Sequence, residues 1–511
     1  MARVGALPVA VAVGLVLGLA AAPAAADPPP SPDPPPPLCC PWWSDYNGDH
    51  HGDVLTSDIR DVAGFTRAGA VSVVYSDANG LTTAGSQLIT MATPGVPGGG
   101  PSANAFFGHA VASGDFDEDG YGDAAIGGNP LYAGPGQVVV LYGSSRGLHG
   151  TREAQAKAEL LTPEEHLPRG VRGDTFGIAL ATGDVDWDGH ADLAIGDAQA
   201  NLVVVLHGTP DGLEPGAGVT AITPQTPGLP WDFAAGDVFG HSLVFGDFNG
   251  DHHDDLAVGA PGRVQGDAFQ AGEVFVFYSD KEQITLAGAQ SFTQNTPGVP
   301  ETSEPLDHFG WALASGNLSP DFDEELAIGA PSEKFNDMNP SGQVTVLRGS
   351  PSGVTTTGAS MLTGAGDSQF GSSLAVVPMD TTYLAVGAPA QAVGPSIEAG
   401  AVYLFPRSPE GPTPVGSSVW TLDTAGMPGP AAYGDAFGNA LKPILLGDDI
   451  TYPYQLVVSA IGRDSGALVD AGGLFLIRAA KAPTATGSQY IDPATLVGGA
   501  VATAGLGYSL G

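Results

Sequence analysis

The stretch FGHSLVFGDFNGDHHDDLAVGAPG, residues 239–262, decides the fold, because it contains patterns that recur along the chain. It begins with Phe-Gly and a short apolar segment, continues into an acidic loop, and ends in a second apolar segment that leads to Gly-Ala-Pro. Short apolar runs bounded by turn residues are typical of strands that are covered on both faces. The stretch therefore predicts two buried strands joined by an acidic loop.

The same unit returns every 61 to 70 residues, which indicates a repeat architecture. After the second strand comes a glycine-initiated run rich in β-branched and aromatic residues, and then a turn-rich segment. Each unit thus supplies about four strands, which make one blade of a β-propeller. The Phe-Gly pairs begin at Phe107, Phe176, Phe239, Phe309, Phe370 and Phe437.

A seventh copy of the Phe-Gly strand lies at the C-terminus. Residues 506–510 (LGYSL) share the pattern of residues 239–243 (FGHSL), 69 residues after Phe437. The first acidic loop, at Asp45, has no such strand before it, so the last strand is expected to complete the N-terminal blade. The sequence predicts an all-β, seven-bladed β-propeller over residues 42–511, closed by a C-terminal strand that pairs into the N-terminal blade.

Four loops, numbered 1 to 4, follow the pattern D-x-[DN]-x-D-x-x-x-D, with carboxylate or amide oxygens at positions 1, 3, 5 and 9. The main-chain carbonyl of position 7 would add another oxygen. Such a set suits Ca²⁺, which takes about six to eight oxygen ligands, better than Mg²⁺, and it lacks the last glutamate of an EF-hand. We predict about four Ca²⁺ ions. The expected ligands are Asp45, Asn47, Asp49, His51 and Asp53; Asp115, Asp117, Asp119, Tyr121 and Asp123; Asp184, Asp186, Asp188, His190 and Asp192; and Asp247, Asn249, Asp251, His253 and Asp255.

The later loops lose this pattern. Loop 5, residues 317–325, keeps some oxygens, whereas the sixth (377–383) offers almost none and the seventh (447–455) lacks the pattern. In loops 1 and 4 the sharp-turn position 6 is His50 or His252, where loops 2 and 3 have glycine. Because histidine tolerates positive φ only moderately, these two sites are expected to be weaker.

Composition and charge narrow the class of protein. The chain has 75 glycines and 44 prolines in 511 residues, yet 43% of its residues are hydrophobic, which fits a turn-rich chain with a packed core rather than a disordered one. Its net charge is -38, from 55 acidic and 17 basic residues. This charge repels phosphate backbones, so no nucleic acid partner is expected.

The N-terminal segment has the features of an export signal. Residues 1–26 contain Arg3, an apolar run and small residues before a cleavage site, which predicts a signal peptide. Residues 27–41 predict a Pro-rich tether, whose Cys39 and Cys40 could form a vicinal disulfide, link two chains or stay free. No later segment predicts a membrane span. The chain is therefore expected outside the cell, either secreted or associated with the cell wall or envelope.

The order Phe-Gly, calcium loop, Gly-Ala-Pro is the pattern of the FG-GAP repeat, and Gly-Ala-Pro stands at residues 259–261, 329–331 and 387–389. Over nearly all of the mature chain, the sequence resembles the N-terminal propeller of the integrin α subunit and bacterial secreted proteins with this repeat. The resemblance implies calcium on a lower face and a ligand surface on the opposite, upper face. The chain lacks the inserted adhesion domain and the leg domains of that family, so an integrin β-type partner is not expected. By this analogy the upper loops include residues 97–105, 227–237 and 331–341.

These observations predict a binding module rather than an enzyme, of an adhesion type, with an extracellular protein or glycan on its upper face. The alternative is a propeller-based extracellular hydrolase or lyase that acts on polysaccharide or phospholipid, since FG-GAP propellers also accompany such enzymes. Against it, seven blades occupy the chain, and no Gly-x-Ser-x-Gly or zinc motif occurs in a fitting context. A structural envelope protein is a third possibility. A cluster of carboxylates and basic residues in one upper-face pocket would favour the enzyme.

Overall fold

The computed structural model describes residues 44–58, 64–128, 135–148, 158–166, 173–213, 219–321, 323–333, 341–379, 381–446, 454–466, 468–479, 483–497 and 505–511. All of them belong to one compact unit, Leu38–Gly511. The predicted signal peptide (1–26) and tether (27–41), including Cys39 and Cys40, lie outside the described residues. The start of the propeller domain at residue 42 therefore stays a prediction.

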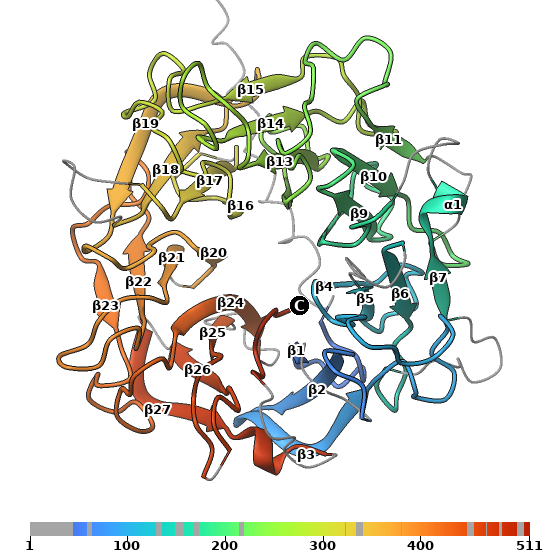
Figure 1. Ribbon diagram of the computed structural model, residues 1–511, viewed down its shortest axis with the longest axis vertical. Coiled ribbons are helices and arrows are strands. Elements are labelled where there is room, and N and C mark those ends of the chain that lie inside the picture. Colours follow the sequence, from blue (N-terminus) through green and yellow to red (C-terminus); the bar gives the residue numbers. More distant parts are fainter. Residues whose placement is uncertain are drawn as a thin grey trace, which may run out of the picture. The chain divides into compact units, whose positions relative to one another are not determined.

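Seven antiparallel sheets, here called blades 1 to 7, surround a central axis (Figure 1). In the described part of the chain one sheet has three strands and six have four. Blade 1 has β1 (Val54–Asp58), β2 (Ala70–Asp77) and β3 (Gly80–Ile89); blade 2 has β4 (Val111–Gly114), β5 (Asp123–Gly128), β6 (Gln137–Leu141) and β7 (Glu159–Leu161); blade 3 has β8 (Ala179–Gly183), β9 (Asp192–Asp197), β10 (Leu202–Leu206) and β11 (Thr220–Ile222); blade 4 has β12 (Ser242–Gly246), β13 (Asp255–Ala260), β14 (Glu273–Phe277) and β15 (Gln290–Phe292).

The remaining blades repeat this order of strands. Two short helices, α1 (Pro163–His166) and the 3-10 helix Pro493–Thr495, lie outside the sheets. Blade 5 has β16 (Leu313–Gly316), β17 (Glu325–Ala330), β18 (Gln343–Arg348) and β19 (Thr355–Thr363); blade 6 has β20 (Ser373–Val377), β21 (Tyr383–Ala388), β22 (Ala401–Pro406) and β23 (Ser418–Trp420); blade 7 has β24 (Phe437–Leu445), β25 (Tyr454–Ala460), β26 (Leu474–Ala479) and β27 (Pro483–Ile491).

The second strand of each blade is almost entirely buried because both of its faces are covered. In β13, Leu256 and Val258 pack in a cluster with Val203 of blade 3, whereas Ala257 packs with Leu326 of blade 5. Side chains alternate along a strand, so one set meets the previous blade and the other set meets the next. The predicted all-β, seven-bladed propeller is confirmed.

The phenylalanine of each Phe-Gly pair lies between neighbouring blades. Phe309 is fully buried and shares a cluster with Val274 of blade 4 and Ile328 of blade 5. Gly272, just before β14, pairs in parallel with Phe309. Its φ is 92°, and a Cβ there would lie 2.1 Å from the Phe309 carbonyl oxygen, so the position requires glycine. The same contact joins Gly342 to Phe370, Gly400 to Phe437 and Gly472 to Leu506.

Residues 507–511 complete blade 1, as the sequence predicted. The N–H of Leu55 donates to the carbonyl of Gly511 (3.1 Å), and the N–H of Gly511 donates back to Leu55 (2.9 Å). Leu506 takes the place of the phenylalanine and packs in a cluster that contains Val54 of blade 1 and Leu474 of blade 7. Figure 1 shows the C-terminus near the centre of the ring, beside β1.

The connections between strands sort onto two faces of this unit. Because the sheets are antiparallel, the loop between the first and second strands of a blade lies on one face, here the lower face. The connections between the second and third strands, and those from blade to blade, lie on the opposite, upper face. Among the described residues, no helix has the length and hydropathy needed to cross a membrane.

Leu506→Ala is expected to lower the free energy of unfolding by about 2–5 kcal/mol, because it leaves a cavity at the joint between blades 7 and 1. Urea unfolding measures this loss. Val497→Ala is the control, since the side chain of Val497 is 54% exposed. A chain without residues 506–511 that melts at the temperature of the full chain would contradict the closure.

Candidate functional site

The four acidic loops lie on the lower face because each of them precedes the second strand of its blade. Loop 1 (45–53) leads into β1, loop 2 (115–123) joins β4 to β5, loop 3 (184–192) joins β8 to β9, and loop 4 (247–255) joins β12 to β13. The loops therefore belong to four consecutive blades.

The aspartate at position 1 organises each loop through main-chain hydrogen bonds. Asp45 accepts at Oδ1 from the N–H groups of Gly48 (2.7 Å) and Asp49 (3.1 Å), and at Oδ2 from that of His50 (2.8 Å). Each loop is wound tightly around this carboxylate. In loops 2 to 4, the N–H groups of positions 5 and 6 donate in the same way, at 2.9 to 3.2 Å, to Asp115, Asp184 and Asp247.

The aspartate at position 9 anchors each loop to its sheet. These four side chains are at most 1% exposed. Oδ2 accepts from the N–H of position 2 at 2.8 to 3.2 Å, and Oδ1 accepts from an N–H at the end of the third strand at 2.8 to 3.0 Å. A carboxylate held at both oxygens presents its remaining lone pairs in a fixed direction. The pairs of anchor and third-strand donor are Asp53 with Ser76, Asp123 with Gly143, Asp192 with Gly208, and Asp255 with Ser279.

The residue at position 7 is tied to position 5 by its own N–H. The bond runs to Oδ1 of the position-5 aspartate at 2.9 to 3.1 Å in all four loops. This bond places position 7 beside the carboxylates from which the predicted ion would take its oxygens. The residues concerned are His51, Tyr121, His190 and His253.

Positive φ occurs at positions 4 and 6 of every loop. Loops 1 and 4 have glycine at position 4, with His50 (66°) and His252 (72°) at position 6. Loops 2 and 3 reverse the order, with Glu118 (52°) and Trp187 (58°) at position 4 and glycine at position 6. Each loop therefore holds one left-handed residue other than glycine. The strain that led us to expect weaker sites in loops 1 and 4 is shared by all four loops.

Burial raises the pKa of several loop carboxylates. The pKa rises to about 6 for Asp115 and Asp184 and to about 8 for Asp255; neighbouring aspartates add to the rise, whereas main-chain hydrogen bonds oppose it. Ionised carboxylates are thus unfavourable at these positions unless a positive charge lies beside them. A bound cation would supply that charge.

Loops 2 and 3 each bring three carboxylates together, with one oxygen of each within 4.8 Å of the others. Ca²⁺ binds oxygens at about 2.3–2.6 Å, so two ligands on opposite sides of one ion lie about 5 Å apart. Both groups therefore fit a single hard cation. The groups are Asp115, Asp117 and Asp123 in loop 2, and Asp184, Asp186 and Asp188 in loop 3.

Loops 1 and 4 differ because position 3 is an asparagine. The amide oxygens of Asn47 and Asn249 each accept from the N–H of position 5 at 2.9 Å. Among the residues that the structure describes, no group of three acidic or histidine side chains converges in these two loops. The main-chain frame is shared by all four loops, and the number of converging carboxylates separates loops 2 and 3 from loops 1 and 4.

Loop 3 also includes a histidine that the sequence analysis missed. Nδ1 of His207, just after β10, lies 3.3 Å from Oδ1 of Asp192 and 3.6 Å from Oδ2 of Asp186. Burial lowers the pKa of His207, but the hydrogen bond and charge of Asp192 and the charge of Asp186 outweigh this effect and raise it. His207 offers loop 3 either a positive charge or a nitrogen ligand. Because His207 lies outside the D-x-D pattern, no sequence motif pointed to its place beside loop 3.

Loop 5 contains a cation that the protein itself supplies. Arg348, the last residue of β18, places Nε 3.6 Å from Oε1 of Glu325 and Nη2 3.5 Å from Oδ2 of Asp321. Ser319 also donates from Oγ to Glu325 at 2.7 Å. The guanidinium lies where the carboxylates need positive charge. The seventh loop lies largely outside the described residues.

Main-chain hydrogen bonds join each loop to the next. The carbonyl of position 1 accepts from the N–H of position 8 in the following loop. Because the loop is wound around position 1, displacement of this residue would also move its neighbour, so the four candidate sites are physically coupled. The pairs are Asp45 with Gly122 (2.7 Å), Asp115 with Ala191 (2.8 Å), Asp184 with Asp254 (3.1 Å) and Asp247 with Glu324 of loop 5 (2.9 Å).

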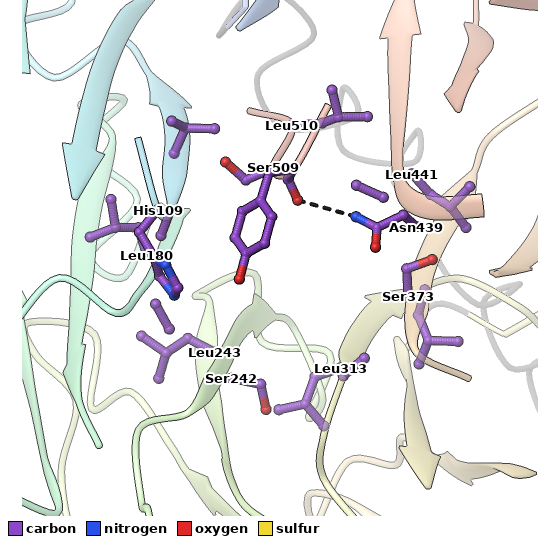
Figure 2. Close-up of a pocket in the computed structure, with 17 residues that line it drawn as sticks. His109, Leu180, Ser242, Leu243, Leu313, Ser373, Asn439, Leu441, Ser509 and Leu510 are labelled. Atoms are coloured by element: carbon purple, nitrogen blue, oxygen red, sulfur yellow. Dashed lines mark hydrogen bonds between the residues drawn. The ribbon is translucent and has the colours of Figure 1, made fainter. Parts of the chain in front are cut away.

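A pocket of about 290 Å³ lies on the axis, where the inner segments of all seven blades meet (Figure 2). Its described lining contains no carboxylate, lysine or arginine. Asn439 donates from Nδ2 to the carbonyl of Tyr508 at 3.4 Å across the joint between blades 7 and 1. One branched aliphatic side chain from each blade lines the pocket: Leu510, Val111, Leu180, Leu243, Leu313, Leu374 and Leu441.

Three serines of the pocket hold neighbouring blades together. Each donates from Oγ to the carbonyl of the glycine in the Phe-Gly pair of the next blade. These hydroxyls are engaged in the joints of the ring, so they are not poised as nucleophiles. The bonds run from Ser242 to Gly310 (2.7 Å), from Ser373 to Gly438 (2.8 Å) and from Ser509 to Gly108 (3.0 Å).

Aromatic and imidazole rings lie where the inner strands begin, at the upper end of the axis. The ring of Tyr508 is 5.4 Å from that of His109, and the ring of Trp311 is 4.6 Å from that of His241. Each of these residues follows the glycine of a repeat, so the fold gathers them around the axis. Trp311 is 40% exposed. Trp231, which the sequence analysis singled out on an upper loop, instead packs against Phe275 at 4.8 Å.

Comparison with known proteins relates these features to a repeat family. The model of the FG-GAP repeat matches residues 239–277. Integrin alpha-PS2 of Drosophila melanogaster is 31% identical over 206 residues, which are 39% of this chain and 14% of that protein. Human integrin alpha-IIb is 28% identical over 280 residues, or 50% of this chain and 24% of that protein. The predicted FG-GAP repeat and the predicted similarity to integrin α subunits are confirmed.

The chain also matches a named enzyme. Human phosphatidylinositol-glycan-specific phospholipase D is 29% identical over 251 residues, which are 45% of this chain and 27% of that protein. The chain thus spans between 14% and 27% of the length of these three relatives. Among solved structures, the Dos1 propeller aligns over 89% of this chain and 88% of its own, with 12% identity and a TM-score of 0.42.

Removal of calcium is expected to lower the melting temperature. A ligand present at about 100 times its Kd stabilises a fold by about 2.7 kcal/mol per site, so four sites would contribute roughly 10 kcal/mol. Thermal melts with calcium and with a chelator measure the effect. Asp117→Asn should reduce it, whereas Asp211→Asn, at an exposed turn, should not. An identical melting temperature with and without chelator would contradict the metal prediction.

Acid is expected to destabilise the fold through His241. Burial lowers its pKa to about 4, and the charges of His109 and His308 act in the same direction. Between this value and the ordinary pKa of about 6.5, the unfolded state binds more protons, so stability falls as the pH falls. At pH 5 the group should cost roughly 2 kcal/mol. Urea unfolding at pH 7.5 and 5, in saturating calcium, should show a smaller loss for His241→Gln; equal losses would contradict the assignment.

Proposed function

We propose that this chain is a calcium-stabilised binding module that works outside the cell and takes an extracellular protein or glycan on its upper face. Calcium would sit in loops 1 to 4, held by the aspartates and asparagines at positions 1, 3, 5 and 9 and by the carbonyl of position 7. The observation that carries the calcium part is the convergence of three carboxylates in loop 2 and three in loop 3, with oxygens within 4.8 Å of one another. When bound, the ion neutralises these carboxylates and holds the loops wound.

The axial pocket supports binding as the function of the upper face. Its walls combine aliphatic side chains with a few polar groups, which is typical of ligand sites. Trp311, which precedes the lining residues Ala312 and Leu313, exposes 40% of its surface beside His241. An exposed tryptophan suits a sugar ring or an apolar or aromatic side chain of a protein. The ligand would therefore contact Trp311 at the axis.

The chemistry of the pocket favours binding over catalysis. Its described lining offers no carboxylate for general acid or base work, and its three interblade serines donate to main-chain carbonyls. Burial lowers the pKa of His109, which keeps this imidazole neutral at physiological pH. The convergence of carboxylates and basic residues that would favour an enzyme is absent from the described pocket lining.

The second candidate is an extracellular hydrolase or lyase that acts on polysaccharide or phospholipid. The similarity to phosphatidylinositol-glycan-specific phospholipase D favours it, although this chain spans only 27% of that human protein. In this alternative the propeller would deliver substrate to catalytic groups that the pocket does not supply. Hydrolysis of phospholipid or polysaccharide by the purified chain would select it over the binding module.

Location outside the cell rests on the predicted signal peptide. It agrees with the strongly acidic chain, whose net charge of -38 bound calcium would offset in part. Attachment to a cell wall or envelope through the Pro-rich tether remains part of the proposal. The resemblance to integrin α subunits covers at most half of this chain in the matches given above. We do not propose an integrin β-type partner.

Trp311→Ala is expected to weaken ligand binding at least tenfold, because the ring supplies exposed aromatic surface at the mouth of the pocket. The measurement is binding to arrayed glycans and immobilised matrix proteins in saturating calcium. Trp187→Ala is the matched control, since Trp187 is 49% exposed and lies on the lower face. Equal losses in both folded variants would contradict a ligand at the axis, and hydrolytic activity without binding would support the enzyme.

A further inference from the structure

One position on the upper face is equivalent in blades 4 to 7. It lies three residues after the second strand, and its carbonyl accepts from the N–H of the glycine that precedes the third strand. The equivalence is therefore set by the main chain and not only by sequence spacing. The residues are Arg263 (2.9 Å to Gly272), Glu333 (3.1 Å to Gly342), Gln391 (2.9 Å to Gly400) and Arg463 (2.9 Å to Gly472).

In blades 4 and 7 this position holds an arginine that pairs with a buried aspartate. Nη1 of Arg263 lies 2.6 Å from Oδ2 of Asp237, and Nη1 of Arg463 lies 2.9 Å from Oδ2 of Asp435. Each aspartate stands two residues before the phenylalanine that opens its blade. In blade 6 both positions are uncharged. In blade 4 the same guanidinium also contacts Glu273, with Nε 2.6 Å from Oε2. In both charged blades an arginine therefore lies against the buried carboxylates.

Blade 5 places two acidic residues at these positions, Glu333 and Asp307. Asp307 stands in the same turn as its counterparts: it accepts at Oδ2 from the N–H of the residue three positions earlier, Glu304, at 2.5 Å, as the aspartates of blades 4 and 7 do at 2.8 and 2.6 Å. A carboxylate therefore replaces the guanidinium while the surrounding main chain is unchanged. The replacement removes a positive charge and adds a negative one.

A third carboxylate and a buried amide complete the group. Oxygens of Glu304, Asp307 and Glu333 lie within 4.8 Å of one another, and Asp307 and Glu333 are only 1% and 3% exposed. Gln294, 1% exposed, donates from Nε2 to Oε2 of Glu333 at 2.6 Å. Its Oε1 is buried and has no hydrogen-bond partner among the described residues. The amide of Gln294 thus contacts the carboxylates, and its oxygen remains available as a ligand.

The electrostatics of this group require a positive charge. Burial, followed by the charge of Asp307, raises the pKa of Glu333 to about 8. Two buried carboxylates in one site cannot both ionise without compensation, so either a proton or a cation resolves the repulsion. Carboxylate and amide oxygens are hard ligands, which suit Ca²⁺, Mg²⁺ and Mn²⁺. A set made of protein oxygens is more typical of Ca²⁺, because Mg²⁺ usually keeps several of its waters.

We propose that Glu304, Asp307, Glu333 and the amide oxygen of Gln294 form a Ca²⁺ site on the upper face of blade 5. The ion takes the place that an arginine guanidinium occupies in blades 4 and 7. The site is separate from the loop sites of the proposed function, because it lies at the other end of the strands. It would anchor the connection from blade 4 to blade 5 against the connection between β17 and β18.

The test is Glu333→Arg, which restores the arginine of blades 4 and 7. We expect the folded variant to bind one Ca²⁺ fewer than the wild type in native mass spectrometry and calorimetric titration with calcium alone. Its melting temperature in chelator should equal or exceed that of the wild type, since the arginine replaces the ion. Glu410→Arg reverses the charge of an exposed glutamate and should leave the number of bound ions unchanged.

An equal number of ions in the wild type and Glu333→Arg would overturn the proposal and assign the compensating charge to a proton on Glu333. If Glu333→Arg does not fold, Glu304→Gln decides, because Glu304 is exposed. Loss of at least tenfold in the affinity of one ion supports the site, and unchanged affinity overturns it. The loop sites are tested separately by the effect of Asp117→Asn on the melting temperature. A negative result for the blade 5 site would therefore not contradict the proposed function.

Discussion

The propeller depends on the main-chain hydrogen bonds between residues 507–511 and β1, because these bonds turn a row of seven sheets into a ring. The joint between blades 7 and 1 repeats the contacts of the other joints, with Gly472 against Leu506. On its other side the closing segment bonds to blade 2, from Ser509 to Gly108. An open ring would expose the edge of β1 and the apolar faces of two blades. The closed ring places the acidic loops on one face and the mouth of the axial pocket on the other.

Negative charge is the second constraint, and the chain meets it in different ways around the lower face. In blades 1 to 4 the loops are wound around aspartates, and burial raises the pKa of those in blades 1 to 3. Calcium is the compensation that we propose. In blade 5 Arg348 lies against Glu325 and Asp321 instead. Loop 5, which has lost the acidic pattern, thus has the guanidinium of Arg348 beside its carboxylates. The hydrogen bond from Glu324 to Asp247 continues the chain of linked loops into that blade.

The upper face follows the same rule with other residues. Arginines balance the aspartates of blades 4 and 7, and the proposed ion would do so in blade 5. The blades of this chain can be compared with one another, because the main-chain contacts show which positions are equivalent. The axis differs from the rest of the upper face, because the described pocket lining has no carboxylate, lysine or arginine and burial keeps the imidazoles of His109 and His241 neutral. Polar ligands with a strong charge have no counter-charge in the described pocket lining.

The sequence by itself determined the strands, the number of blades, the closure and the places of the acidic loops. Strand formation and loop winding depend on residues within one repeat, so the repeat period and the D-x-D spacing predict them. The final LGYSL, residues 506–510, predicted the closure because it repeats the pattern of the other Phe-Gly strands. Only the tertiary structure decided which side chains from separate segments lie in contact. The pairs are His207 with Asp186, Arg348 with Glu325, Trp311 with His241, and Glu333 with Asp307. These partners come from different loops, strands or blades. Their distance is set by how sheets pack around an axis, which spacing along the chain does not encode.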